Sequence, residues 1–418
     1  MQVTPRERIV LESIAERGDD LVGRAVGWCA GNSGSRNLEG LRATLDLLTG
    51  VWGEALPQAA VSHEALEPTV ELGVDGRESL HQPPPALLLT MRPEAPVQVV
   101  LTGHYDTVFA AGSPFQAVRE RGDGALNGPG IADMKGGISV MLGALEAFET
   151  FPGREAVGWR VLLSPDEEIG SLGSGAVLAR IGRLGHVGMT YEPALADGTL
   201  AGARKGSGNF HVKVTGRSAH AGRAFEEGRN AVTAAARIAG ALDGLNGRRE
   251  GVTVNVARID GGSALNVVPD LAVVRFNVRF PDEAGRRWLE GEVEAACGCG
   301  RGDGLGVKVF GGVTRAAKPF NAAQAALFEG VREVGAALGQ EIAWKPSGGV
   351  CEGNNLFAVG LPNVDTLGVR GGDIHSEAEF AWPDSFVERA QLSALMLMKM
   401  ASGEVDARGL RAMMGEGA

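Results

Sequence analysis

The sequence has little cysteine and no long apolar run. Its 418 residues include four cysteines, too few for a disulfide framework. Cys297 and Cys299, in "ACGCG", have no second cysteine pair or histidine nearby, so we interpret them as loop thiols. No run of about eighteen apolar residues occurs, which argues against a membrane-spanning helix. The opening "MQVTPRERIVLESIAERGDD" lacks the apolar core of a signal peptide, and we expect a cytoplasmic protein.

Positive charge is also scarce. Forty Lys and Arg stand against 51 Asp and Glu, a net charge of −11, which argues against nucleic acid or an anionic membrane as a partner. Glycine is abundant at 63 residues, but the phosphate-loop spacing GxxxxGK[ST] is missing and "GPGIAD" does not open a dinucleotide fingerprint. We therefore set a nucleotide-binding enzyme aside. With 44% hydrophobic residues, the chain is a globular protein of roughly two to three domains.

Strand-like and helix-like segments alternate along much of the chain. Amphipathic patterns predict helices over 5–30 and 37–55, and further helices in "GGISVMLGALEAFE" and "GSGAVLARIG". Predicted strands between them are "ALLLTM", "VQVVLTG", "WRVLLS" and "VGMTYEP". This rhythm predicts an α/β fold with a mostly parallel sheet and helices on both faces.

The pattern changes between residues 206 and 314. Alternating and helical segments follow one another there in the order β-α-β-β-α-β, which predicts a separate α+β sandwich inserted into a first domain made of 1–205 and 315–418. The linkers near 204–208 and 312–319 are short, which favours hinge motion between the two domains. We expect the last dozen residues, "ARGLRAMMGEGA", to be frayed.

Polar residues stand where predicted strands end. His104 and Asp106 close "VVLTGHYD", Asp133 lies in a Gly-rich turn, Glu192 follows "MTY", and His375 lies in a later loop. Singly, each has an ordinary explanation, such as a hydrogen-bonded core histidine or a helix N-cap at Asp133. Together they fall at the carboxyl ends of strands of one parallel sheet, where such folds build their sites. Two imidazoles with carboxylates and no thiolate predict catalytic Zn²⁺, with Mn²⁺ or Co²⁺ as alternatives.

The stretch "SPDEEIGS" crowds Asp166, Glu167 and Glu168 together, which calls for positive charge nearby. If Asp133, Glu168 and Glu192 all bind metal, their charge of −3 leaves +1 against two divalent cations. A single cation would be over-neutralised by three carboxylates and would be a poor Lewis acid. The charge count therefore favours two metal ions.

The order of the motifs resembles metallopeptidase family twenty, the co-catalytic zinc amidohydrolases. The resemblance runs from about residue 85 through nearly all of the remaining chain, and "AGARKGSGNF" and "SGGVCEGNN" look most like the glutamate-carboxypeptidase branch. It implies a zinc exopeptidase-like catalytic domain with a ferredoxin-like lid and dimerisation domain. The motifs that carry it are "GHYDTV", "GPGIADMKGG", "DEEIGS", "YEP", "GRSAHAG", "NVVPD" and "IHSEAEF".

The resemblance also implies roles for these residues. Asp133 would bridge the two ions, and Glu167 would be the general base and acid beside them. Asp166 would lie behind the ligands or in solvent. The remaining ligands would be His104 and Glu192 on one ion and Glu168 and His375 on the other, with Asp106 orienting His104.

Substrate recognition is implied in the same way. His220, by default a loop histidine, would reach into the partner subunit's site and stabilise the oxyanion, which implies a homodimer formed through residues 206–314. Arg279, which a surface salt bridge would equally explain, would grip the substrate's free α-carboxylate. Asn266 would also contact substrate, and Gly349 would let backbone amides approach it.

We therefore expect a dinuclear zinc hydrolase that cleaves the amide bond of an N-acyl amino acid or small peptide with a free carboxylate, most like glutamate carboxypeptidase. The alternatives are an acetylornithine deacetylase or a succinyl-diaminopimelate desuccinylase. A binding protein that kept the pocket without catalysis is a more remote alternative, because a pure binder has no need of Glu167.

Overall fold

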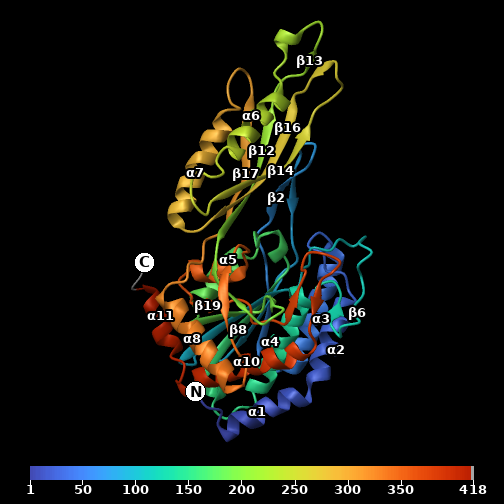
Figure 1. Ribbon diagram of the computed structural model, residues 1–418. Coiled ribbons are helices and arrows are strands. Elements are labelled where there is room, and N and C mark those ends of the chain that lie inside the picture. Colours follow the sequence, from blue (N-terminus) through green and yellow to red (C-terminus); the bar gives the residue numbers. More distant parts are fainter. Residues whose placement is uncertain (416–418) are drawn as a thin grey trace.

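The computed structural model describes residues 1–415 and has two lobes, which Figure 1 draws one above the other. The lower lobe is built on a six-stranded sheet in the order β1-β4-β8-β5-β9-β19. Strands β8, β5, β9 and β19 run parallel. At one edge β4 pairs antiparallel with β8, and β1 pairs antiparallel with β4. The strands are β1 (Ala60–Glu64), β4 (Ala86–Met91), β5 (Val97–His104), β8 (Val157–Ser164), β9 (Val187–Thr190) and β19 (Asn363–Val364).

Helices cover both faces of the central strands, because side chains of β4, β5 and β8 alternate between two apolar clusters. Leu87, Val99 and Val161 belong to the larger cluster, whereas Leu88 and Val100 belong to the smaller one. The larger cluster includes residues of α1 (Pro5–Glu16), α2 (Gly18–Cys29), α3 (Leu38–Ala55), α4 (Gly136–Phe148), α8 (Ala322–Ala337), α10 (Asp384–Ser402) and α11 (Ala407–Gly415); the smaller includes residues of α5 (Gly175–Gly182) and α9 (Glu352–Ala358). The predicted α/β class with a mostly parallel sheet is confirmed.

Two predictions, one at each end of the chain, were wrong. The helix expected over 5–30 is broken at Arg17, whose backbone leaves helical geometry and separates α1 from α2. At the other end, the residues expected to be frayed form α11, because Ala407 and Leu410 are buried in the larger cluster. Residues 416–418 of that segment lie outside the described residues.

The upper lobe is a four-stranded antiparallel sheet in the order β14-β16-β12-β17 with its own apolar core. Its elements follow the predicted β-α-β-β-α-β order, apart from two short added strands, β13 (Ala219–His220) and β15 (Val267–Val268). Cys297 is buried within the second helix, so its prediction as a loop thiol was wrong, whereas Cys299 is exposed just after that helix. The main elements are β12 (Gly206–Thr215), α6 (Ala231–Asp243), β14 (Thr253–Gly261), β16 (Leu271–Phe280), α7 (Glu283–Gly298) and β17 (Gly306–Arg315).

The chain crosses between the lobes on strands rather than on loop linkers. One crossing passes from β11 (Leu200–Arg204) directly into β12, and the other leaves β17 and continues to Lys318. The backbones of Arg204 and Lys318 exchange two hydrogen bonds of 2.9 Å, so the two crossings are paired with each other.

A hairpin of the lower lobe makes a third link between the lobes. Strands β2 (Thr69–Leu72) and β3 (Glu78–His81) rise toward the upper sheet (Figure 1). The Arg275 guanidinium in β16 donates hydrogen bonds to the carbonyls of Leu72 and Gly73 at 2.7 and 2.9 Å. Lys308 in β17 lies 3.0 Å from the Glu78 carboxylate. No helix in the described part of the chain is long and apolar enough to cross a membrane.

Small sheets at the mouth of the lower lobe hold the loops around the candidate site. One has the order β10-β20-β21-β7-β6 and another pairs β11 with β18 in parallel. These strands are β6 (Arg119–Glu120), β7 (Leu126–Asn127), β10 (Ala194–Leu195), β18 (Trp344–Ser347), β20 (Arg370–Gly372) and β21 (Phe380–Ala381).

Candidate metal centre

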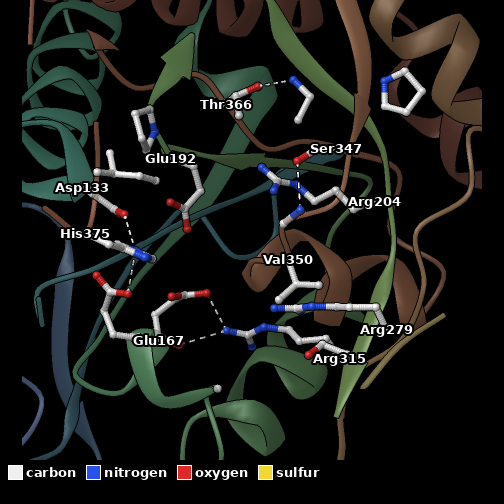
Figure 2. A pocket seen from close by; sticks show the side chains of 18 of the residues that line it. Asp133, Glu167, Glu192, Arg204, Arg279, Arg315, Ser347, Val350, Thr366 and His375 are labelled. Carbon is white, nitrogen blue, oxygen red and sulfur yellow. Dashed lines mark hydrogen bonds and ion pairs between the residues drawn. The ribbon is translucent and has the colours of Figure 1, made fainter. Parts of the chain in front are cut away.

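The predicted ligands converge at the carboxyl ends of the parallel strands. His104 is the last residue of β5, the acidic stretch follows β8, and Glu192 comes two residues after the end of β9. These ends open on a cavity of about 410 Å³ between the lower lobe and the base of the upper one, and Figure 2 shows its lining. These residues therefore lie together at the edge toward which the parallel strands point.

Asp106 fixes both His104 and the acidic turn. The His104 Nδ1 atom lies 3.3 Å from Asp106 Oδ1 and 3.1 Å from the Asp106 carbonyl oxygen, which leaves Nε2 facing the cluster. The same carboxylate accepts hydrogen bonds from the backbone N–H groups of Glu167 and Glu168 at 3.1 and 3.2 Å, and from the Ser35 hydroxyl at 2.7 Å. Its contacts thus include the orientation of His104 that was predicted, and they extend to the two glutamates.

Asp133 lies between the two histidines. Its Oδ1 atom is 3.1 Å from His104 Nε2, and its Oδ2 atom is 3.2 Å from His375 Nε2 (Figure 2 draws the second contact). The backbone at Asp133 departs from helical geometry inside the one-turn segment Ile131–Lys135, so this residue is not a simple N-cap. Each carboxylate oxygen faces a different imidazole, which is the arrangement a bridging ligand needs.

Glu168 and Glu192 complete the cluster on either side. Glu168 Oε2 lies 3.2 Å from His375 Nε2, and Glu192 Oε1 lies 3.8 Å from His104 Nε2. The helix α4 starts close behind Glu192, because a Cβ atom on Gly137 would lie 2.0 Å from the Tyr191 carbonyl oxygen. The absence of a Cβ atom at Gly137 therefore allows this close approach.

The electrostatics of the cluster indicate a site for cations. Burial would lower the pKa of His104, but hydrogen bonds to neighbouring carboxylates outweigh it and raise that pKa well above its usual value. Hydrogen bonds to Asp133 and Glu168 raise the pKa of His375 to about 11. Burial, with the charge of Asp133, raises the pKa of Glu192 to about 7 and also raises that of Glu168. The carboxylates that raise the pKa values of both histidines would equally attract metal cations.

The donor set fits a metal centre. One ligand atom each from His104, Asp133 and Glu168 lies within 4.8 Å of the others, and the same holds for His104, Glu167 and Glu192. The Glu168 Oε1 atom is buried without a hydrogen-bond partner among residues 1–415. Neutral imidazole nitrogens and carboxylate oxygens without thiolates suit Zn²⁺, Mn²⁺ or Co²⁺.

Two of the three clustered acids have partners that the sequence did not reveal. Glu167 forms a 2.6 Å ion pair with the buried Arg315, whose other guanidinium nitrogen donates to Asn355 at 2.6 Å. Asp166 is buried rather than solvated, and it accepts hydrogen bonds from the backbone N–H groups of Gly173 and Ser174 at 2.7 and 3.2 Å. The position of Arg315 at the end of an alternating strand was the one sequence feature that could have drawn attention to this residue. Nothing in the sequence indicates that it pairs with Glu167.

Glu379 is a further residue that sequence reasoning missed. It is buried, and its carboxylate accepts hydrogen bonds from the backbone N–H groups of Gly130, Ala132 and Asp133 at 3.2, 2.9 and 3.0 Å. It therefore holds the loop that presents Asp133. Its place in "HSEAEF", four residues after His375, was the only hint.

The predicted substrate residues fall into two groups. Arg279 and Gly349 line the cavity, and the Arg279 Nη1 atom is buried without a hydrogen-bond partner in the described residues. His220 and Asn266 are exposed and lie together at the far end of the upper lobe, where Ala221 N–H donates to the Asn266 carbonyl at 2.9 Å (β13 in Figure 1). Within one chain, this second pair lies away from the cavity.

Comparisons with known proteins place the chain in one family. Residues 100–399 match peptidase family M20/M25/M40. Carboxypeptidase G2 of Pseudomonas sp. (strain RS-16) is 29% identical over 322 residues, which cover 73% of this chain and 74% of that protein. Succinyl-diaminopimelate desuccinylase 2 of Shewanella loihica is 27% identical over 308 residues, covering 66% and 80% of the two chains.

Solved structures share the fold at low sequence identity. Human carnosine dipeptidase 1 superposes with a TM-score of 0.69 at 16% identity, covering 95% of this chain and all of that one. The metallo-carboxypeptidase Sso-CP2 of Sulfolobus solfataricus gives a TM-score of 0.69 at 15% identity, covering 90% and 98% of the chains. A Bacillus subtilis protein described as a dinuclear metal-binding peptidase gives 0.62 at 16% identity, with 92% and 98% coverage. Because the family match spans more than half of the chain, this protein belongs to peptidase family M20/M25/M40 and is a metal-dependent hydrolase.

Proposed function

We propose that this protein is a cytoplasmic, dinuclear zinc amidohydrolase. It cleaves the amide bond of an N-acyl amino acid or small peptide that carries a free carboxylate, as a glutamate carboxypeptidase does. The observation that carries the proposal is the position of Asp133, whose two oxygens each face one histidine at 3.1 and 3.2 Å. Two ions would lie on either side of this carboxylate, with His104 and Glu192 on one and Glu168 and His375 on the other.

Glu167 is proposed as the residue that moves the proton. Divalent cations at this cluster would supply Lewis-acid polarisation of the scissile carbonyl and would make water more acidic. The Glu167 carboxylate would accept a proton from the attacking water and return it to the leaving amine nitrogen. Its ion pair with Arg315 and the hydrogen bond from its backbone to Asp106 keep this side chain at the edge of the cluster.

Arg279 is proposed to bind the substrate's α-carboxylate. Its guanidinium lines the cavity, and one of its nitrogens is buried and unpaired in the described residues. A bidentate carboxylate would satisfy that nitrogen and would orient the amide toward the metal centre. Gly349, which also lines the cavity, would let backbone amides approach the substrate.

His220 is proposed to act in a homodimer formed through residues 206–314. Its exposed position beside Asn266, away from the cavity of its own chain, is consistent with a role in the partner subunit's site. There it would stabilise the oxyanion of the tetrahedral intermediate, and Asn266 would contact the substrate.

A desuccinylase is the second candidate, supported by the similarity to succinyl-diaminopimelate desuccinylase 2. A panel of N-acyl-glutamate, dipeptides, N-acetylornithine and succinyl-diaminopimelate would separate the candidates when metal content is measured on the same sample. We expect two metal ions per chain and turnover of at least one carboxylate-bearing amide. Two bound zinc ions with no turnover on a broad amide panel would instead support a binding protein.

A further inference from the structure

A buried charged triad adjoins the cavity opposite the metal centre. Arg204 at the end of β11 lies with its Nε atom 2.8 Å from Asp365 Oδ2, and Lys318 Nζ lies 2.7 Å from the same oxygen. Lys318 and Asp365 have no side-chain exposure, and Arg204 has 8%. Sequence patterns could not indicate this triad, because its members come from three distant segments.

The triad has one cation more than its single carboxylate can neutralise. Lys318 donates its three hydrogen bonds to the Asn363 carbonyl, the Asn363 side chain and Asp365, as an ammonium group does. Arg204 uses only its Nε atom on Asp365, and neither of its Nη atoms donates a hydrogen bond to a described residue. Its Nη groups are open to the cavity, where they are free to donate hydrogen bonds to an anion.

The free side of Arg204 faces the cavity. Arg204 is part of the cavity lining, together with Ser347, its neighbour in the β11–β18 pair, and Gly349. A Cβ atom on Gly349 would lie 3.6 Å from Arg204 Nη1, so the loop after β18 passes directly over the guanidinium. Figure 2 shows the group pointing into the space that the metal cluster borders.

Arg204 is separate from Arg279. Figure 2 draws the two guanidinium groups apart on the same wall of the cavity, with Val350 between them. A carboxylate held in a fork by one guanidinium has both oxygens engaged. A substrate with a single carboxylate would therefore leave one of the two groups unpaired.

We propose that Arg204 binds a second carboxylate of the substrate, so that the enzyme prefers dianionic N-acyl amino acids over monoanionic ones. This inference rests on the proposed amidohydrolase function and deepens it. The second carboxylate has two possible sources: the side chain of an acidic leaving amino acid, or an acyl group that itself ends in a carboxylate. Both present the same chemistry to Arg204, and substrates can distinguish them.

Two matched substrate pairs make the test, and each member keeps the α-carboxylate. N-acetylglutamate against N-acetylglutamine varies the side chain, and N-succinylalanine against N-butanoylalanine varies the acyl end. We expect the metal-loaded wild type to prefer the dianionic member of one pair by about 10- to 100-fold in kcat/KM, the range for hydrogen bonds to a charged group. Arg204→Gln should remove that preference by lowering kcat/KM for the dianionic substrate only, and Arg204→Lys should keep part of the preference.

Lys345→Gln is the matched control, because Lys345 also lines the cavity from β18 but is exposed to solvent. It removes the same charge and should change the preference less than about twofold, since exposed charges are screened. Equal kcat/KM values within both pairs for the wild type would overturn the inference, and this comparison needs no variant. An equal loss of kcat/KM on both members of a pair in Arg204→Gln would also overturn the inference. Arg204 would then bind the α-carboxylate that both substrates carry, or would serve only to stabilise the fold.

Failure of the proposed function would look different. If the metal-loaded wild type hydrolysed none of the four amides, the amidohydrolase proposal would fail, and the same pairs would be compared by calorimetric binding. Tighter binding of a dianionic member that is lost in Arg204→Gln would still sustain the carboxylate subsite. Equal binding within both pairs would overturn it.

Discussion

Glu379→Gln should damage the metal centre without touching a proposed ligand. One Glu379 oxygen accepts from the Ala132 and Asp133 N–H groups, and the other accepts from Gly130 N–H. Glutamine keeps the first oxygen but presents an NH₂ group to Gly130, so one hydrogen bond to a charged group is lost, worth about 1.5–3 kcal/mol. The two that remain lose their charge assistance, but the change also removes a buried charge that Asp133 repels, so we expect the free energy of unfolding to fall by about 1.5 kcal/mol.

The second effect of this change is on metal affinity. Substituting a residue that orients metal ligands typically lowers metal affinity by about 10- to 100-fold. Glu379 is such a residue, because it holds the loop of the proposed bridging ligand Asp133. The assay is metal competition against a chelator at pH 8, with urea denaturation of the metal-free protein in parallel. That pH is above the value of about 7 to which burial and the charge of Asp133 raise the pKa of Glu379.

Glu377→Gln supplies the control, because Glu377 lies two residues away in the same loop and is exposed. It changes the same functional group and should alter stability by less than about 0.5 kcal/mol, as surface substitutions usually do. If Glu379→Gln matched Glu377→Gln in both stability and metal affinity, the reasoning that assigns the loop geometry to Glu379 would be refuted.

Three further predictions concern the metals, the substrate and the partner subunit. Chelation should abolish activity and lower the unfolding midpoint, because ions that bind the folded state stabilise it. Metal affinity should rise with pH, because the pKa of His375 is raised to about 11 and a metal ion must displace a proton from that imidazole. Titrations that showed the opposite pH trend would contradict this. Arg279→Ala should raise KM for carboxylate substrates far more than for their amidated analogues, and equal effects in steady-state kinetics would count against the role. The variants His220→Ala and Glu167→Gln should each be nearly inactive. When the two variants are mixed and their subunits exchange, about half of the dimers are mixed and each mixed dimer has one complete site, so about a quarter of wild-type activity should return. No recovery after verified exchange would exclude a site shared between subunits.

The ligand positions could be predicted because strand ends are visible in a sequence. His104 and Glu192 follow apolar runs directly, and parallel strands bring such ends to one edge. The periodicity could not reveal the break at Arg17, because the apolar pattern continues on both sides of it. The chain end "ARGLRAMMG" does carry an amphipathic helical pattern, which the expectation of a frayed end overlooked, and Ala407 and Leu410 pack it against the larger core.

The polar partners behind the ligands could not be predicted. Glu379 reaches the backbone of residues almost 250 positions earlier, and Arg315 meets Glu167 across the boundary between the two lobes. Such contacts depend on how distant segments meet in space, and each residue alone reads as an ordinary charged position. The same holds for Asp365, which only the fold brings to Arg204.

The β2–β3 hairpin sets a condition on any opening of the cavity. The covalent crossings at Arg204 and Lys318 are bonded to each other, so they provide a single axis about which the upper lobe could swing. The hairpin touches the upper sheet elsewhere, through Arg275 on two carbonyls and Lys308 on Glu78. A rotation of the upper lobe about that axis must therefore either break these contacts or bend the hairpin. Shortening the hairpin would remove this restraint without altering a residue of the catalytic cavity.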